Sequence, residues 1–397
     1  DIAIGRKTGK SAIYAYESMR KKWKFLGVIT FIVPVIIMTY YAVIGGWILK
    51  YIAIYILGSG KEAVADNCFT DFITSPSSVW YGIVFMLLTA IIVYNGVEKG
   101  IERVSKFIMP VLLVMVVGIA IFSLTLKTTL DDGTVRTGLQ GLKVYLTPDM
   151  SGITVQKFLQ VSLDAMSQLF FSLSVSMGIM ITYGSYMRKE DNIESSVRQI
   201  EVFDTLVAFL SGLIIVPAVF VFSGGDENAL NAGPSLMFIT LPNVFKEMLG
   251  GQIVGAVFFL LVVLAAMTSS ISLMETVVSI VEERFHWKRI PSCLIVTGIS
   301  FLIGLLSVFG YSIWSDFTIF HMQFLDFFDY ISNNIMMPIV ALMTCVLVGF
   351  VVKTTFVEDE IEKNARFRVK GLYRVMIKFI CPICMLLILF SALFLKL

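Results

Sequence analysis

Nine stretches of the chain are apolar and long enough to cross a lipid bilayer, and more polar connections separate them. A membrane-spanning helix needs about 20 mostly apolar residues. Several stretches are longer than that, so tilted or interrupted helices are expected. The stretches cover 25–57, 79–97, 107–126, 159–186, 201–223, 251–282, 292–313, 327–352 and 374–395. The pattern predicts one all-α membrane domain over 1–397, with nine complete transmembrane helices and, at its start, the stub of a tenth.

The fourth stretch differs from the others because its centre is polar. Residues 167–178 read S-Q-L-F-F-S-L-S-V-S-M-G. A helix that breaks at mid-membrane frees backbone groups, which are tolerated only where they line a cavity or bind something. The alternative is an unbroken helix whose small residues pack against its neighbours.

The charges indicate which ends of the spans face the cytoplasm. Most Lys and Arg residues fall in 6–24, 97–107, 187–200, 282–291 and 353–373, which alternate with poorly charged connections. The positive-inside rule places these basic segments in the cytoplasm and Lys396-Leu397 outside. Two long connections then lie outside, at 127–158 and 224–250, the first with turn signals at Asp131-Asp132-Gly133 and Thr147-Pro148-Asp149.

The composition restricts the protein class further. Residues are 57% hydrophobic and 15% charged, well below the charged share of soluble domains, and a net charge of +2 gives no reason to expect a nucleic-acid partner. Of the five cysteines only Cys68 falls in an expected outer loop, so a disulfide there is not expected. We interpret Cys381-Pro-Ile-Cys384 as packing rather than a metal or redox motif. The sequence also holds no N-x-Ser/Thr glycosylation site. Together these features favour a bacterial inner membrane.

Several polar residues inside the spans are candidates for chemistry. Intramembrane acids are costly and usually functional, and Asp204 and Glu275 are two, although Asp204 could also be interfacial. Asp326 and Asp329 begin a span at its outer side. The hydroxyls of Thr268-Ser269-Ser270 suit sodium, or else bond back to their own helix. Tyr40-Tyr41 at mid-span could bind a substrate carboxylate or a neighbouring helix.

An enzyme is not expected. The histidines are His286 and His321, both near span ends, and the sequence holds no G-x-S-x-G, H-E-x-x-H or phosphate-loop motif. No nucleophile and base appear as a pair.

Eight short segments run in order through nearly the whole chain: Gly5-Arg6, Tyr40-Tyr41, G-V-E-K-G-I-E-R at 96–103, F-F-S-L-S at 170–174, I-T-Y-G-S-Y at 181–186, F-I-T-L-P at 238–242, M-T-S-S-I at 267–271 and L-D-F-F-D at 325–329. In their order and spacing, these segments resemble the neurotransmitter:sodium symporter family, in particular its bacterial sodium-dependent amino-acid transporters. The resemblance implies the inverted-repeat fold of the bacterial leucine transporter type. It also implies sodium-coupled amino-acid symport by alternating access, with sodium ions and no organic cofactor.

The resemblance also implies roles for individual residues. The substrate would be a neutral or hydrophobic amino acid bound by Tyr41, Ile37, Phe171, Ser172, Ser174, Ser176, Met177 and Leu273, with Phe171 as the aromatic lid. Ser172 and Asp204 would bind one sodium ion, and Ala265 (by its carbonyl), Thr268 and Ser269 a second. Asp329 would close the outer gate, and Tyr186 with Glu283 the inner gate. Ser176 stands where some relatives have glycine, so the size of the substrate cannot be inferred from those relatives.

Two departures from the family pattern carry expectations of their own. Asp204 falls where many members have asparagine and Ala208 lacks a hydroxyl, so we expect transport that does not need chloride. The family's first helix and most of its second are missing from the sequence. We therefore expect this chain to hold half of each site and not to transport by itself, whereas its parent protein should. Two alternatives stay open: a proton-coupled carrier of the same fold, with Asp204 or Glu275 titrating, and a membrane receptor that does not transport.

Overall fold

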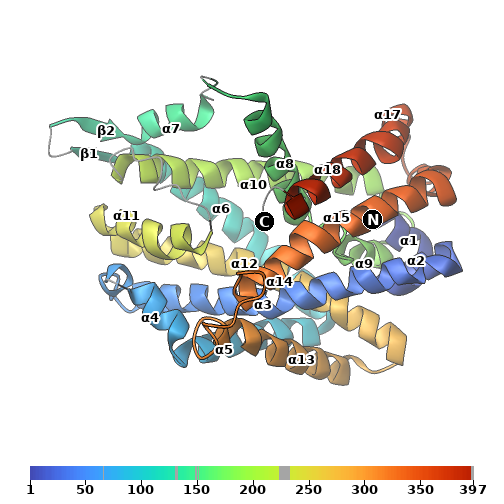
Figure 1. The fold of residues 1–397 in the computed structure, drawn as a ribbon, viewed down its shortest axis with the longest axis horizontal. Coiled ribbons are helices and arrows are strands. Elements are labelled where there is room, and N and C mark those ends of the chain that lie inside the picture. Colours follow the sequence, from blue (N-terminus) through green and yellow to red (C-terminus); the bar gives the residue numbers. More distant parts are fainter. Residues whose placement is uncertain (66, 130–132, 148–149, 151, 223–232, 395–397) are drawn as a thin grey trace.

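The computed structural model describes residues 1–65, 67–129, 133–147, 150, 152–222 and 233–394. Its long helices run side by side between two ends of the molecule (Figure 1). At one end lie α2 (Ala12–Met19) and α17 (Lys370–Val375); we call it the basic end, because the Lys- and Arg-rich connections gather there. At the opposite end lie α4 (Cys68–Thr74) and α11 (Leu241–Glu247).

Eight helical runs within the described residues are long and apolar enough to span a membrane, and they match eight of the nine predicted stretches. Three of these spans combine α-helix with short π-helical turns, which often occur near functional sites. The eight are α3 (Lys24–Ile56), α5 (Ser77–Tyr94), η3 (Val97–Glu102) with α6 (Arg103–Thr125), α10 (Ile193–Phe222), α12 (Gly251–Phe285), α13 (Arg289–Phe309), α14 (Phe324–Asp329) with η6 (Tyr330–Met336), α15 (Met337–Val346) and η7 (Leu347–Val351), and α17 with η8 (Met376–Ile380) and α18 (Cys381–Phe394).

The remaining stretch, predicted at 159–186, is not one helix. It forms α8 (Val155–Ser172) and α9 (Ile179–Tyr186), with non-helical backbone between Ser172 and Ile179. The break falls within the hydroxyl-rich segment, so the prediction of an interrupted helix is confirmed and the alternative of an unbroken packing helix is wrong.

Shorter elements join the spans. They are α1 (Ile2–Thr8), η1 (Lys21–Trp23), η2 (Glu62–Val64), β1 (Lys127–Thr129), β2 (Val135–Thr137), α7 (Gly138–Leu146), η5 (Leu236–Thr240) and α16 (Thr355–Ile361). The antiparallel hairpin of β1 and β2 is a small exception to the all-α prediction. Of the long outer connections, Asp131-Asp132, Pro148-Asp149 and 223–232 lie outside the described residues, as does Lys396-Leu397.

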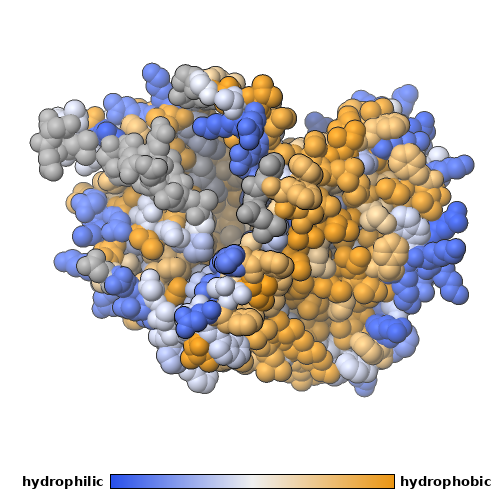
Figure 2. Space-filling view, in the orientation of Figure 1, coloured by the Kyte–Doolittle hydropathy of each residue, from blue (hydrophilic) through white to orange (hydrophobic). Residues whose placement is uncertain are grey.

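The core centres on α3 and α12, which pack against each other along their length, with α5 and α13 beside them. Small residues permit the close approach: a Cβ on Gly46 of α3 would lie 2.5 Å from the backbone of Gly82 in α5. Lipid provides no water for backbone groups, so spans of this kind satisfy their own hydrogen bonds and meet through side-chain packing. Figure 2 shows apolar side chains over a broad band of one face, with hydrophilic side chains at the basic end beyond it.

Candidate functional site

The break between α8 and α9 is built from residues in the left-handed backbone region. Ser174 has φ 52°, Ser176 φ 67° and Gly178 φ 77°. Left-handed backbone is uncommon for residues other than glycine, and it concentrates at functional sites when the surrounding structure holds it. The backbone N–H of Ser176 donates to Asp1 Oδ2 at 3.1 Å, and the side chain of Ser176 is buried. The break is therefore a defined conformation with polar groups at its centre.

Two predicted sodium ligands meet where α8 ends. The Ser172 hydroxyl donates a hydrogen bond to Asp204 Oδ1 of α10. The two residues are 32 positions apart in sequence, and the fold brings a hydroxyl and a carboxylate oxygen together. Hard oxygen donors of this kind are the ligands that small hard cations prefer.

The second predicted cation site lies within one turn of α12. The Thr268 hydroxyl donates to the Ala265 carbonyl of its own helix at 2.8 Å, which is the bond that the alternative to sodium binding predicts. The same bond makes these two oxygens adjacent. Ser269 is exposed, and the phenol of Tyr41 in α3 faces its side chain. Ser270 points elsewhere: its buried hydroxyl lies 3.0 Å from that of Thr89 in α5. The structure thus divides a hydroxyl cluster that the sequence presents as one.

The residues predicted to line the substrate pocket share one hydrophobic cluster. Ile37 of α3, Met177 of the break and Leu273 of α12 are 1%, 3% and 3% exposed. Phe171 and Tyr41 are half-buried and pack against the same cluster. Three elements far apart in sequence therefore converge beside the break.

Asp329, the last residue of α14, belongs to a polar group that our sequence analysis described only in part. Asn333, one helical turn on, donates from Nδ2 to Asp329 Oδ1 at 2.7 Å and to the Tyr40 hydroxyl at 3.2 Å. Asp329 directly precedes the π-helical turn η6, and Asn333 lies within it. We missed Asn333; the signal available was an amide four residues after an intramembrane acid.

At the basic end, the two residues of the predicted inner gate, Tyr186 and Glu283, have different hydrogen-bond partners. The Tyr186 hydroxyl donates to Glu275 Oε1 at 2.6 Å, whereas Glu283 Oε2 accepts from the backbone N–H of Ser11 at 2.8 Å. Glu275 and Glu283 lie two helical turns apart on α12, so each meets a different neighbour. Sequence spacing could not distinguish the two carboxylates.

Glu275 is fully buried, and its charge is balanced by Arg289 of α13. Arg289 Nη1 donates to Glu275 Oε1 at 3.1 Å and Nη2 donates to Oε2. Arg289 also donates to the Val93 carbonyl at 2.7 Å and 3.1 Å. We had identified Glu275 as an intramembrane acid but missed Arg289, the residue at which the next helix begins.

Comparison with known proteins agrees with this architecture. A profile of the Sodium:neurotransmitter symporter family matches residues 68–396. An uncharacterized sodium-dependent transporter of Haemophilus influenzae is 32% identical over 98% of this chain and 85% of its own length, and one of Bacillus subtilis is 30% identical over 98% and 84%. The crystal structure of MhsT in complex with L-phenylalanine superposes with a TM-score of 0.85 at 33% identity, over 98% of this chain and 86% of that chain. This chain therefore belongs to the sodium:neurotransmitter symporter family, a family of sodium-dependent membrane transporters.

Proposed function

We propose that this protein is a sodium-coupled symporter of neutral or hydrophobic amino acids that works by alternating access in the bacterial cytoplasmic membrane. Its basic end would face the cytoplasm, because Lys and Arg concentrate in the connections at that end. The bacterial origin of the two relatives above supports the assignment to a bacterial cytoplasmic membrane.

The observation that carries the proposal is the break at Leu173–Gly178, together with the contact between Ser172 and Asp204. In transporters, discontinuous helices expose backbone groups and helix ends at mid-membrane, where substrate and coupling ions bind. Here a hydroxyl and a carboxylate lie at the end of the first half-helix. We assign them to one sodium ion, and the Ala265 carbonyl, Thr268 and Ser269 to a second.

The amino acid would bind beside the break. Ser174 and Ser176 supply polar groups to its backbone atoms, the Tyr41 phenol binds its carboxylate, and Phe171 closes over it. Ile37, Met177 and Leu273 form an apolar surface for its side chain, in agreement with their shared burial. The L-phenylalanine bound to MhsT supports a hydrophobic side chain.

Two polar groups would control access from the two sides. Asp329, held by Asn333, would close the side opposite the basic end. Tyr186 with Glu275, and Glu283 with Ser11, would close the basic end. Each bound ligand can shift this equilibrium only by its difference in affinity for the two states.

Proton coupling is the competing mechanism, and one contact argues against Glu275 as its proton carrier. Both oxygens of Glu275 accept hydrogen bonds from Arg289, so in this structure the carboxylate is engaged in an ion pair between two helices.

The test is uptake of labelled amino acids by the gene product in proteoliposomes. We expect uptake of phenylalanine or leucine under an inward sodium gradient, and none when potassium replaces sodium. Uptake that follows a proton gradient without sodium would favour the proton-coupled carrier. Binding without uptake would favour the receptor.

Two matched variants test the second ion site. Thr268→Ala removes a hydroxyl that lies against the Ala265 carbonyl, whereas Ser270→Ala removes one that faces Thr89. We expect Thr268→Ala to raise the sodium concentration for half-maximal uptake about ten-fold, the equivalent of roughly 1.4 kcal/mol of binding, and Ser270→Ala to change it little. Equal effects would mean that Thr268 is not an ion ligand.

A further inference from the structure

Cys345 and Cys381 lie opposite each other on two neighbouring spans. Cys345 belongs to α15, which packs against α18, the helix that begins at Cys381. The two spans run in opposite directions, because one connection joins them at the basic end. Both thiols are free, Cys345 is buried and Cys381 is half-buried. The two thiols share a hydrogen bond, and both line one cavity of about 370 Å³ in this chain.

Contacts on either side of the cysteine pair fix its register. One turn toward the basic end, a Cβ on Gly349 of η7 would lie 3.5 Å from Ile377 Cγ2 of η8. One turn in the other direction, Ala341 and Met385 share a small buried cluster. Each cysteine lies four residues from its own helix's members of these two contacts, and residues four apart lie on the same face of a helix. The thiols therefore form the middle one of three successive contacts.

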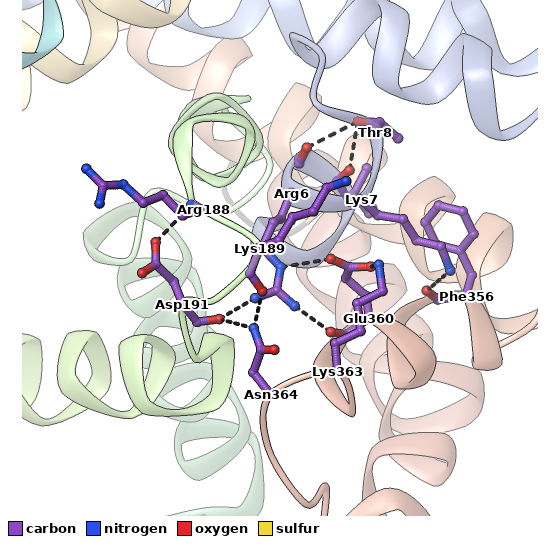
Figure 3. A network of polar contacts seen from close by, with 12 residues as sticks. Arg6, Lys7, Thr8, Arg188, Lys189, Asp191, Phe356, Glu360, Lys363 and Asn364 are labelled. Atoms are coloured by element: carbon purple, nitrogen blue, oxygen red, sulfur yellow. Dashed lines mark hydrogen bonds and ion pairs between the residues drawn. The ribbon is translucent and has the colours of Figure 1, made fainter.

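The connection between the two spans is itself held in place. Glu358 of α16 accepts hydrogen bonds from Arg374 of α17 at 2.8 Å and 2.7 Å. Glu360 of α16 accepts one from Arg6 Nε at 2.8 Å, and both of these side chains are 1% exposed. Figure 3 shows this buried pair with the polar contacts around it. Since separating a buried ion pair is strongly unfavourable, the connection keeps α15 and α18 in one register.

Cys381 is the more accessible of the two thiols. Its neighbours Ile380 and Ile383 are 41% and 55% exposed, so this part of α18 borders the lipid. Lys378 precedes Cys381 by three residues, and its Cγ would lie 3.4 Å from a Cβ on Gly349, so its side chain also starts toward α15. Accessible cysteines near a cation, with a second thiol beside them, are typical sites of oxidation.

Cys384 lies in a different environment, although it is only three residues from Cys381. It packs with Leu163 and Met166 of α8 against the cluster that contains Ala341. We interpret Cys381-Pro-Ile-Cys384 as packing, and the thiol that bonds to Cys381 is that of Cys345. Cys384 therefore provides a matched control on the same helix.

We propose that Cys345 and Cys381 are an oxidation site, which hydrogen peroxide converts into a disulfide between α15 and α18. The site goes beyond the proposed function and does not depend on it, because it requires only the packing of these two spans.

The reaction would take two steps. The sulfur of Cys381 attacks one oxygen of the peroxide, the O–O bond breaks, and the second oxygen leaves as water with the thiol proton. Cys381 is then a sulfenic acid. The sulfur of Cys345 attacks the sulfenic sulfur, the S–O bond breaks, and the hydroxyl leaves as water with the second thiol proton. Two thiols are oxidised to one disulfide, and one peroxide is reduced to two waters.

The test is peptide mass spectrometry on the gene product in native membranes. The membranes are treated with dilute hydrogen peroxide, and the remaining thiols are blocked with N-ethylmaleimide. We expect a linked peptide that contains Cys345 and Cys381, at least about ten-fold more abundant than after unfolding in dodecyl sulfate, because a disulfide needs closely matched geometry. Dithiothreitol should remove the link. Cys384→Ser should keep it, and Cys381→Ser should lose it.

Two further readouts separate the steps. In Cys345→Ser the sulfenic acid on Cys381 cannot be resolved, so dimedone should capture it there, whereas Cys381→Ser should show no capture at Cys345. Oxidation should also raise the melting temperature of the wild-type protein by a few degrees, because the disulfide restricts the unfolded chain, and should leave that of Cys381→Ser unchanged.

Absence of the 345–381 peptide from folded wild-type protein overturns the proposal, even where a variant folds poorly. Equal linkage after unfolding, or a more abundant link between Cys381 and Cys384, overturns it as well. An unchanged or lower melting temperature of the oxidised wild type would contradict a bond that fits between the two spans. None of these measurements uses uptake, so failure of sodium-coupled transport would contradict the proposed function and leave the oxidation site standing.

Discussion

The hydroxyl of Tyr186 donates a 2.6 Å hydrogen bond to Glu275, whose carboxylate also binds Arg289. A residue of the broken helix is thereby tied to a buried ion pair between α12 and α13. Under the proposed function, closing the basic end and stabilising two neighbouring helices would depend on the same carboxylate.

Replacing Glu275 with glutamine should destabilise the protein. Glu275→Gln leaves Arg289 with only the more distant carboxylate of Glu282, 3.3 Å away. Removing one partner of a buried pair costs about 3–5 kcal/mol, whereas exposed pairs contribute about 0–1 kcal/mol. Thermal unfolding in detergent should show a clearly lower melting temperature for Glu275→Gln and only a slightly lower one for the control Glu282→Gln. Similar melting temperatures for both would contradict a structural role of the pair.

Ser172→Ala should weaken sodium activation. The change removes the hydroxyl that meets Asp204, and one lost oxygen ligand corresponds to a roughly ten-fold higher sodium requirement. Ser211→Ala in α10 is the matched control, because the Ser211 hydroxyl only donates to its own helix at Val207, at 2.8 Å. Uptake measured against sodium concentration tests both variants, and an unshifted curve for Ser172→Ala would remove Ser172 from the ion site.

Transport should proceed without chloride. Asp204 places a fixed negative charge beside Ser172, and that charge can balance a bound cation without an anion. We expect uptake in gluconate buffer to equal that in chloride. Asp204→Asn keeps an oxygen ligand and removes the charge, so this variant should bind sodium less tightly. A collapse of wild-type uptake in gluconate would refute the idea.

Gly5→Ala should prevent α1 from packing on α9. The new methyl group would lie 2.0 Å from a backbone oxygen that cannot move independently of its helix. Gly118→Ala is the control, since that glycine is exposed on α6 with open space around its Cβ position and alanine favours helix. Expression level and size-exclusion profile should be poor for Gly5→Ala and unchanged for Gly118→Ala. A well-folded Gly5→Ala would show that the two helices can separate.

Stability should fall in acid through Glu358. Hydrogen bonds from Arg374, at 2.8 Å and 2.7 Å, lower the pKa of this buried carboxyl to about 2. A carboxyl with a lowered pKa stabilises the fold fully above its unfolded value, near 4.5, and progressively less as the pH falls toward 2. Melting temperatures of wild type and Glu358→Gln should therefore converge between pH 5 and roughly pH 3. Glu362→Gln, which removes an exposed partner of Lys370, serves as the control.

Hydropathy located the spans because each span is a local property of the chain. In lipid a helix must satisfy the hydrogen-bonding groups of its own backbone. About 20 apolar residues therefore suffice to predict a spanning helix without knowing its neighbours. The same reasoning predicted the break, since Ser172, Ser174 and Ser176 are polar where a plain span has no need of polarity. The order of the motifs also indicated the family.

Which groups meet across helices was decided by the tertiary structure alone. Ser269 and Ser270 are neighbours in sequence, yet one faces Tyr41 and the other Thr89. Arg6 and Glu360 are 354 positions apart, and nothing local marks them as a pair. Such pairings depend on how each helix is rotated and shifted against the others, which side-chain packing over the whole bundle determines. The sequence by itself determined the spans and the family and indicated where a break could fall, whereas only the packed structure established the break and assigned Tyr186 to Glu275 and Arg6 to Glu360.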